Sequence, residues 1–580
     1  MANRRVNNEG ESVGMKRKGH LLISFGLFFL VQAGGICWSQ TTTRVSVDSA
    51  GGDSNGVSNS SSISSDGRYV AFKSFATDLV TGGTDGNADI FVRDRQTGTT
   101  TIVSVHSDGT EGDLNSNSPS ISGDGRYVAF MSDAPNLVDN DTNDWSDIFV
   151  RDRDADGNGT YDEPGPVGVS TLRVSVYSDG TESIDPSFNP SISGDGRYVA
   201  FDSDGDLVAG DSGNYYDIFV RDLLAGTTTR VSVDSDGNEG SGHSYSPSIS
   251  GDGRYVAFES FATNLVAGGT NGKAHVFVHD RQTGITTIVS VHSDGTEGDH
   301  DSSSPSISGD GRYVAFQSQA DNLVGGDTNL FPLSDIFVHD LQTGITTLVS
   351  VDSTGIQGNG DSSAPSISAD GRYVAFESFA TNLLAGGTNG NAHVFVRDRQ
   401  TGITKIVSVD SLGTEGNGDS LAPSISSDGK YVAFESDANN LVTADDNGIF
   451  DIFSYERESL PPTVDSTSPA HNANDVAVGA AIAATFSEPM NGSTIDVNTF
   501  TLNNGVTGTV TYDANSTTAT FTPSSNLNNT TTYTATITTA AEDLAGNPMQ
   551  ADYTWSFTTQ SEKNNSSGRG PCFIAAAASD

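Results

Sequence analysis

The sequence predicts an all-β protein, made of a seven-bladed β-propeller followed by a smaller β-sandwich. The 580 residues include 65 glycines and are rich in Ser, Thr, Asn and Asp, which favours many short strands joined by turns. One motif recurs seven times at a nearly constant interval. Beyond Pro461 and Pro462 this repeat stops, and a Thr-rich segment with alternating strands begins.

The repeated motif is Asp-Gly-Arg/Lys-Tyr-Val-Ala-Phe. Its copies begin at Asp66, Asp124, Asp195, Asp252, Asp310, Asp370 and Asp428. Successive copies lie 57 to 60 residues apart, except for one interval of 71 residues after Asp124. We interpret each repeat as a four-stranded blade of a propeller over residues 43–457, because a single blade cannot bury both of its faces alone.

Each repeat predicts four strands in a fixed order. The innermost is Pro-Ser-Ile-Ser, as at Pro305–Ser308, and the second is Tyr-Val-Ala-Phe, entered through an Asp-Gly hairpin turn. The third is exemplified by Asp147–Asp152 and His393–Val396. The fourth is Val-Ser-Val, as at Val289–Val291, which follows a Thr-Gly turn.

The phase of the repeat predicts how the ring closes. A Val-Ser-Val copy at Val45 precedes the first blade, whereas none follows Arg457 at the end of the seventh. We therefore expect the segment Arg44–Asp48 to supply the outer strand of the last blade. Such closure would remove an open strand edge.

The N-terminal residues 1–39 have the pattern of a signal peptide. Basic residues at 16–18 precede the apolar run Leu21–Val31, and Met15 is a candidate true start. No other stretch is long and apolar enough to span a membrane, so no transmembrane span is expected in the mature protein. We expect a secreted, extracellular or cell-surface protein, with the periplasm as the alternative.

The charge and the cysteines exclude several classes of protein. Acidic residues number 74 against 29 basic ones, for a formal net charge of −45, which opposes binding to nucleic acid or to an anionic membrane. The two cysteines, Cys37 and Cys572, cannot form a disulfide framework. The last residues, 561–580, are expected to form a disordered tail.

The blade motif Pro-Ser-Ile-Ser-x-Asp-Gly-Arg-Tyr-Val-Ala-Phe, followed by Ile-Phe-Val-Arg-Asp, resembles the WD-like repeat of TolB-type β-propellers. The resemblance covers residues 43–457 and implies the propeller fold. It does not imply one function, because the family includes periplasmic interaction proteins, peptidase-associated propellers and surface proteins.

The C-terminal segment, residues 462–560, resembles the bacterial Ig-like domain of the SbsA type found in surface-layer proteins. The resemblance rests on Ala-Thr-Phe-Ser-Glu-Pro-Met at 484–490, Ala-Gly-Asn at 545–547 and Trp-Ser-Phe-Thr-Thr at 555–559. It implies an Ig-like β-sandwich with strands at Ile482–Phe486, Gly508–Tyr512 and Tyr533–Thr538. Domains of this kind mostly act as spacers or adhesive modules.

The 71-residue interval contains a candidate calcium loop. Its residues fit the pattern Asp-x-Asp-x-Asp-Gly-x5-Glu, in which oxygen ligands surround a hard cation and the glycine permits a sharp bend. No helices are expected around it, so it is predicted to be an EF-hand-like loop in a hairpin, and an acidic solvated insertion is the alternative. The predicted calcium ligands are Asp152, Asp154, Asp156, Asn158 and Glu163.

A second candidate site follows from loop lengths. The first-to-second and third-to-fourth connections of the blades are tight turns on one face, apart from the single calcium insertion, and the long connections lie on the other face. The long loops carry the aromatic residues that break the repeat, which suit a protein- or glycan-binding surface. The predicted ligand-binding residues are Trp145, Tyr215, Tyr216, Phe331 and Phe450.

Three functions remain open. The chain is expected to be a non-catalytic binding or structural protein, because no nucleophile elbow, zinc-binding helix or phosphate loop is present. The alternatives are a glycan-active or other extracellular enzyme that uses the propeller, and a periplasmic TolB-like interaction protein. The identity of the protein or glycan ligand and the oligomeric state do not follow from the sequence.

Overall fold

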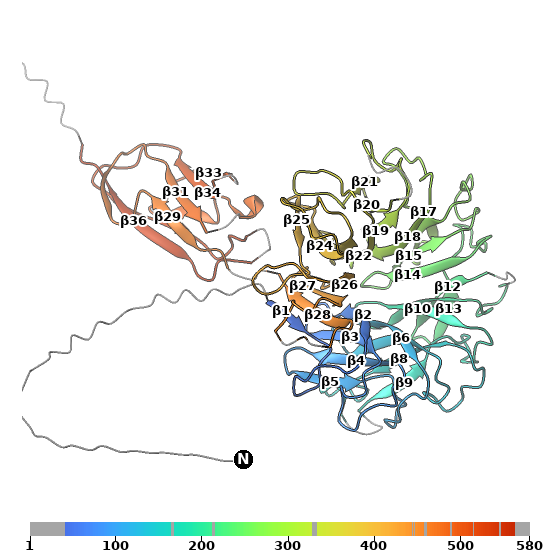
Figure 1. The fold of residues 1–580 in the computed structure, drawn as a ribbon. Helices are drawn as coiled ribbons and strands as arrows, with labels where there is room; N and C mark the ends of the chain where they lie inside the picture. Colours follow the sequence, from blue (N-terminus) through green and yellow to red (C-terminus); the bar gives the residue numbers. More distant parts are fainter. Residues whose placement is uncertain are drawn as a thin grey trace, which may run out of the picture. The chain divides into compact units, whose positions relative to one another are not determined.

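The computed structural model describes residues 41–163, 168–211, 215–327, 333–443, 445, 447–457, 461–487, 490–513, 516–543 and 547–562. The predicted signal peptide, Phe331 and all but the first two residues of the predicted tail lie outside the described residues. The regular elements of the described chain are strands, apart from one short 3-10 helix at Gly492–Thr494 (Figure 1). Within it, no helix has the length and apolar character needed to cross a membrane.

Seven four-stranded antiparallel sheets form the blades of a propeller, as the repeat predicted (Figure 1). From the inner to the outer strand, blade 1 is β2 (Ser58–Ile63), β3 (Tyr69–Ser74), β4 (Asp89–Asp94) and β5 (Thr99–Ile102); blade 2 is β6 (Ser116–Ile121), β7 (Tyr127–Ser132), β8 (Asp147–Asp152) and β9 (Ser170–Arg173); blade 3 is β10 (Ser187–Ile192), β11 (Tyr198–Ser203), β12 (Asp217–Asp222) and β13 (Thr227–Arg230); blade 4 is β14 (Ser244–Ile249), β15 (Tyr255–Ser260), β16 (His275–Asp280) and β17 (Ile285–Ile288). Blade 5 is β18 (Ser302–Ile307), β19 (Tyr313–Ser318), β20 (Asp335–Asp340) and β21 (Ile345–Leu348); blade 6 is β22 (Ser362–Ile367), β23 (Tyr373–Ser378), β24 (His393–Asp398) and β25 (Ile403–Ile406); blade 7 is β26 (Ser420–Ile425), β27 (Tyr431–Ser436), β28 (Asp451–Glu456) and β1 (Thr41–Arg44).

The two middle strands of every blade are buried on both sides. In blade 1, Val70, Ala71 and Phe72 are fully buried, because the neighbouring blades cover both faces of the sheet. The rings of Phe72 and Phe91 stack across the two strands with their centroids 5.9 Å apart. An equivalent phenylalanine pair recurs in each of the other six blades.

The outer strand of blade 7 comes from the N-terminal end of the described chain. Strand β1 pairs antiparallel with β28, from Thr41 opposite Glu456 to Arg44 opposite Phe453. The sequence placed this strand at Arg44–Asp48, several residues too far along the chain. The same correction applies to every blade, because each outer strand ends just before Val-Ser-Val. Val-Ser-Val begins just after the outer strand, where its side chains are buried and its serine bonds the third strand, as Ser46 does with Asp451.

A belt of backbone hydrogen bonds joins all seven blades around the axis. Each bond runs between the turns that connect the inner and second strands of adjacent blades, and the last one, from Ser427 N–H to the Ser65 carbonyl at 3.1 Å, joins blade 7 to blade 1. The donor and acceptor residues are Ser65 to Gly123, Gly123 to Gly194, Asp195 to Gly251, Gly251 to Gly309, Asp310 to Ala369, Ala369 to Ser427 and Ser427 to Ser65.

The repeated arginine and aspartate of the motif pair within one blade. Arg68 Nε and Nη2 donate to Asp94 Oδ1 and Oδ2 at 3.1 and 2.7 Å, and the same bidentate pair recurs in blades 2 to 6. The guanidinium also stacks on the adjacent Tyr69, whose ring is contacted from blade 2 by Arg153. These contacts support a structural role for the two residues.

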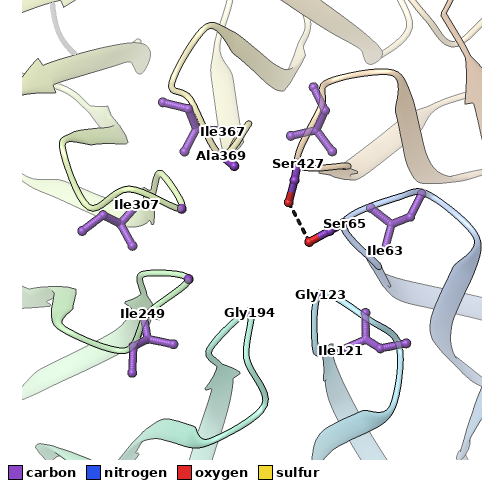
Figure 2. Close-up of a pocket in the computed structure, with 13 residues that line it drawn as sticks. Ile63, Ser65, Ile121, Gly123, Gly194, Ile249, Ile307, Ile367, Ala369 and Ser427 are labelled. Carbon is purple, nitrogen blue, oxygen red and sulfur yellow. Dashed lines mark hydrogen bonds between the residues drawn. The ribbon is translucent and has the colours of Figure 1, made fainter. Parts of the chain in front are cut away.

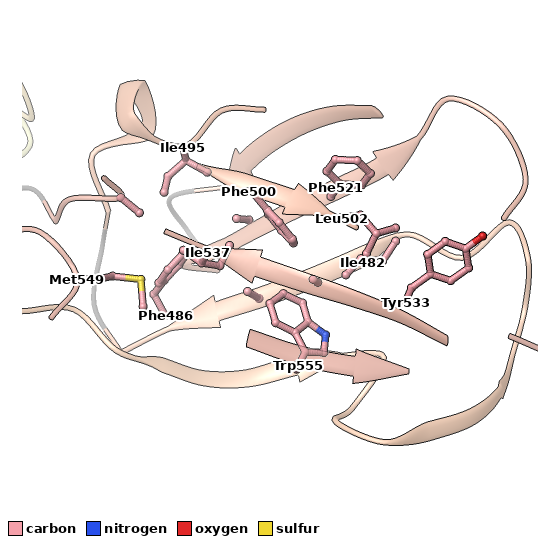
Figure 3. Packing of buried hydrophobic residues seen from close by; sticks show 14 of the residues in the cluster. Ile482, Phe486, Ile495, Phe500, Leu502, Phe521, Tyr533, Ile537, Met549 and Trp555 are labelled. Atoms are coloured by element: carbon pink, nitrogen blue, oxygen red, sulfur yellow. The ribbon is translucent and has the colours of Figure 1, made fainter. Parts of the chain in front are cut away.

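The C-terminal domain is a sandwich of two four-stranded sheets. One sheet is β29 (Val464–Ser468), β31 (Ile482–Phe486), β34 (Thr518–Pro523) and β33 (Gly508–Asp513); the other is β30 (Ala473–Val476), β36 (Tyr553–Thr559), β35 (Thr532–Ile537) and β32 (Phe500–Leu502). Alternate residues of the facing strands fill the core, where Trp555 packs on Phe500 (Figure 3). The predicted strands therefore form, with small shifts at their ends.

Candidate functional site

The propeller has two faces with different connections. The tight-turn face carries the turns between first and second and between third and fourth strands, such as 64–68 and 95–98. The long-loop face carries the connections from second to third strand and from each blade to the next, such as 75–88 and 103–115. The described residues of the predicted aromatic site lie on the long-loop face. The predicted calcium loop lies on the tight-turn face, between β8 and β9.

The opening on the axis at the tight-turn face is lined by isoleucines and small residues (Figure 2). Its lining residues are Ile63, Ser65, Ile121, Gly123, Gly194, Ile249, Gly251, Ile307, Gly309, Ile367, Ala369, Ile425 and Ser427. The only hydroxyls among them, on Ser65 and Ser427, bond each other at 2.8 Å. This lining holds no acid, base or thiol that could act on a substrate.

On the long-loop face, the structure gathers five aromatic side chains from blades 3 and 4. Tyr215 and Tyr216 precede β12, His243 precedes β14, Phe188 lies in β10 and Tyr245 lies in β14. The His243 ring lies 5.2 Å from Tyr215, 5.7 Å from Tyr216 and 5.7 Å from Tyr245, measured between centroids. Tyr216 contacts Tyr245 and Phe188, at 5.3 and 6.1 Å. We call these five residues the aromatic cluster.

Local backbone geometry sets the position of the cluster. Phe188 and Tyr245 each stand one residue before a β-bulge in an inner strand, and the bulge residues Asn189 and Ser246 have φ values of 51° and 53°. Tyr216 N–H donates to His243 Nδ1 at 3.0 Å, which ties the loop before β12 to the next blade. Tyr215 keeps 38% of its surface exposed.

Acidic groups lie beside the aromatic cluster. The buried Asp202 accepts hydrogen bonds from Asn189 Nδ2 at 3.0 Å and from Ser246 N–H at 3.3 Å. Burial raises the pKa of Asp202 to about 6. The pKa of Tyr216 is raised, first by burial and then by the nearby carboxylates, Asp204 foremost. The cluster therefore combines ring surface with hydrogen-bond acceptors.

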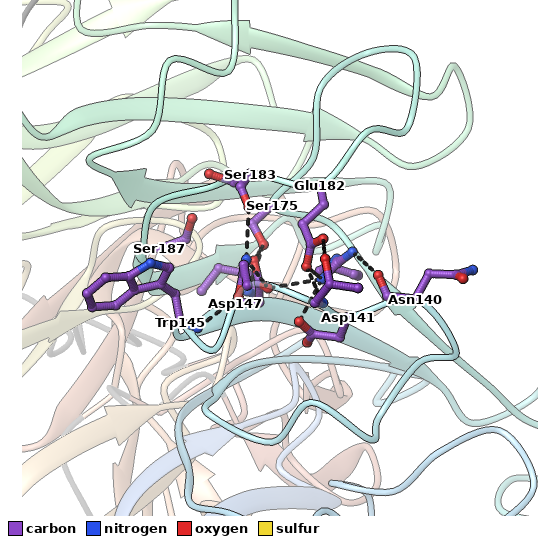
Figure 4. Close-up of polar contacts among 12 residues, drawn as sticks. Asn140, Asp141, Trp145, Asp147, Ser175, Glu182, Ser183 and Ser187 are labelled. Carbon is purple, nitrogen blue, oxygen red and sulfur yellow. Dashed lines mark hydrogen bonds and ion pairs between the residues drawn. The ribbon is translucent and has the colours of Figure 1, made fainter.

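Of the other predicted ligand-binding residues, Trp145 and Phe450 stand apart from the cluster. Trp145 is 52% exposed and lies two residues before β8, the position that Tyr215 has before β12 (Figure 4). Phe450 is half-buried, and its carbonyl accepts from Ser58 N–H at 2.9 Å. Neither ring contacts another aromatic ring among the residues that the structure describes.

Sequence reasoning missed Phe188, His243 and Tyr245. All three depart from the residues at the same place in other blades, so a comparison of inner strands could have found them. It also missed three phenylalanines that begin the long loops of blades 1, 4 and 6, each within a Ser-Phe-Ala-Thr segment. Their exposed fractions are 40% for Phe75, 45% for Phe261 and 48% for Phe379.

The structure brings most of the predicted calcium ligands close together. Asn158 Nδ2 donates to Asp156 Oδ2 at 2.9 Å and to Glu163 Oε2 at 2.6 Å, and Asn158 N–H donates to Asp154 Oδ1 at 2.9 Å. Asp152 differs, because both of its carboxylate oxygens accept from Arg126, at 2.8 and 2.9 Å. The loop is thus compact, and its first position belongs to the repeated ion pair.

Comparison with known proteins identifies the C-terminal domain. Residues 458–559 match the family model of the bacterial Ig-like domain, so the resemblance noted in the sequence is confirmed there. No curated protein sequence matches the chain.

Solved structures with similarity to the chain include TolB proteins and a peptidase. A putative TolB from Agrobacterium tumefaciens is 16% identical with a TM-score of 0.31, over 54% of this chain and 84% of that one. TolB from Acinetobacter baumannii is 17% identical with a TM-score of 0.32, over 64% and 76%. An acylaminoacyl peptidase from Pyrococcus horikoshii is 11% identical with a TM-score of 0.39, over 66% of this chain and 49% of that one.

Proposed function

We propose that this chain is a non-catalytic, secreted or cell-surface protein whose propeller binds a protein or glycan on its long-loop face. The observation that carries the proposal is the aromatic cluster of blades 3 and 4. Its five rings come from two blades and three separate segments, and they depart from the repeat that explains the rest of the propeller.

The chemistry of the cluster suits such a ligand. Aromatic side chains offer a large contact area at low cost in conformational entropy, and they dominate the energetics of many interfaces. The C–H faces of a sugar ring or an apolar side chain can pack on Tyr215 and Tyr245. Neighbouring carboxylates and amides, such as Asp204 and Asn189, can accept or donate hydrogen bonds that fix the orientation of the ligand.

A glycan array together with a pull-down from bacterial envelope extract would identify the ligand. The double variant Tyr215→Ala/Tyr245→Ala should then weaken binding at least tenfold, because it removes two rings and leaves the blade cores unchanged. Leu224→Ala is the matched control, since Leu224 is 79% exposed on the tight-turn face of blade 3. Full binding by the tyrosine variant, with loss in Leu224→Ala, would place the site on the other face.

We also propose that calcium stabilises the loop 152–163. Asp154, Asp156, Asn158 and Glu163 support this proposal, because their oxygens are hard ligands on a short, sharply bent segment. The insertion also packs on blade 1, where Tyr161 contacts Tyr69 with the ring centroids 5.5 Å apart. An ion in the loop would therefore strengthen the junction between blades 1 and 2.

A further inference from the structure

Every blade carries a group of three polar side chains at the same place on the long-loop face. One comes from the loop before the third strand, one is the first residue of that strand, and one lies in the connection that leads to the next blade. The groups are Asp85, Asp89 and Glu111; Asp141, Asp147 and Glu182; Asp211, Asp217 and Glu239; Asn271, His275 and Glu297; Asp327, Asp335 and Gln357; Asn389, His393 and Glu415; and Asp445, Asp451 and Asp53.

In three blades, an arginine at the end of the outer strand neutralises part of this charge. Arg173 Nη1 lies 3.1 Å from Asp141, 3.2 Å from Asp147 and 2.6 Å from Glu182, whose carboxylates converge in Figure 4. Arg230 does the same in blade 3, and Arg44 in blade 7. These clusters therefore hold their own cation.

Three further blades replace an acid with a hydrogen-bond donor. In blade 5, Gln357 Nε2 donates to Asp327 and to Asp335, both at 2.7 Å. In blade 4, His275 Nε2 lies 3.0 Å from Asn271 and 3.3 Å from Glu297. Blade 6 repeats that arrangement with His393.

Blade 1 has three acids and none of these partners. Its outer strand ends in Ile102, which pairs with Phe91 as Arg173 pairs with Phe149, so an apolar side chain stands where blade 2 has the guanidinium. Carboxylate oxygens of Asp85, Asp89 and Glu111 all lie within 4.8 Å of one another. Within the described residues, no lysine, arginine or histidine forms an ion pair with any of the three.

The buried carboxylate of Asp89 has an oxygen atom that a ligand could satisfy. Its side chain is completely buried, and Oδ1 accepts from Ser104 Oγ at 2.7 Å. Oδ2 is also buried, and among the described residues no N–H or hydroxyl group donates a hydrogen bond to it. An ionised oxygen left unpaired in the interior is costly, so a cation or a proton must satisfy it.

We propose that Asp85, Asp89 and Glu111 form a binding site for a hard divalent cation, with Ca²⁺ as the expected ion. All the protein ligands are carboxylate oxygens, which Ca²⁺ prefers. Asp85 is exposed and Glu111 is half-buried, so the ion can enter from solvent and complete its coordination with water. In blade 1 the ion would neutralise the carboxylate charge that arginine neutralises in blades 2, 3 and 7.

The other blades suggest substitutions that test the site, because this fold already accommodates those residues at the equivalent positions. Ile102→Arg introduces the residue of blades 2 and 3, and Glu111→Gln introduces that of blade 5. Both are made in a chain that also carries Asp156→Ala/Glu163→Ala, which removes ligands of the loop 152–163. Isothermal titration with CaCl₂ then reports on the blade 1 site.

The chain with the altered loop should bind one Ca²⁺, with a Kd of about 10⁻⁴ to 10⁻³ M, the range of extracellular calcium modules. Ile102→Arg and Glu111→Gln should each weaken this binding at least tenfold, and Ile102→Arg should make the melting temperature independent of calcium. Absence of calcium binding before these substitutions, or an isotherm that neither changes, would overturn the proposal. A shared proton would then satisfy Asp89.

Discussion

Deleting residues 41–49 removes the outer strand of blade 7 and should destabilise the propeller by several kcal/mol. Val45 and Val47 have exposed fractions of only 1% and 7%. Burial of a valine side chain contributes about 1.5–3 kcal/mol, so their loss alone costs about 3–6 kcal/mol. The deletion also takes Ser46 and Arg44 from the buried Asp451, whose carboxylate then loses its cationic partner and keeps hydrogen bonds from the neutral Ser54 and Asn447.

The assay compares chains that begin at Thr41 and at Ala50. Calorimetry should show a lower melting temperature for the shorter chain, and size-exclusion chromatography should show association through the exposed edge of β28. A synthetic peptide of residues 41–49 should restore both properties by pairing with that edge. Equal melting temperatures for the two chains would refute the reasoning.

Three further outcomes are expected. Asp154→Ala/Glu163→Ala should abolish the calcium titration of the loop in a Glu111→Gln chain, and an unchanged isotherm would exclude the loop as a site. Burial lowers the pKa of His279 from 6.5 to about 4, so the folded protein loses stability as the pH falls from 6.5 to 4. Urea titrations at pH 7 and pH 4 should show that His279→Arg removes about 3 kcal/mol of this loss. An equal loss in both chains would mean that the imidazole is solvated in the folded protein. Gly311→Ala would place a Cβ 2.1 Å from the Tyr255 ring, at a residue whose φ is +73°. Urea unfolding should show that the free energy of unfolding falls by more than about 2 kcal/mol. A smaller decrease would mean that neighbouring blades move apart at little cost.

The sequence predicted the blades well because the repeat encodes them directly. The second and third strands are continuous apolar runs flanked by glycine turns, and both features are local. The outer strand was misplaced because Val-Ser-Val is more apolar than the Thr-Thr-Thr-Arg strand before it. An edge strand buries little, as the exposed Thr41 and Thr43 show, whereas the valines after it anchor the chain in the core.

The candidate site was predicted only in part, for reasons of geometry. Tyr215 and Tyr216 stand out in their loop, but their partners lie in inner strands where a bulge changes the direction of the side chains. The unbalanced negative charge at Asp89 becomes visible only when the outer strands of different blades are compared position by position. That comparison aligns Ile102 of blade 1 with Arg173 of blade 2.

Hydrogen–deuterium exchange of the full chain, with and without the ligand found by the array or the pull-down, tests the central claim most directly. Binding at the aromatic cluster should slow exchange in the segments around Tyr216 and His243 on the long-loop face. Exchange in the tight turns at 64–68 and 95–98 should stay unchanged. Protection confined to those turns, or to the C-terminal sandwich, would contradict the account.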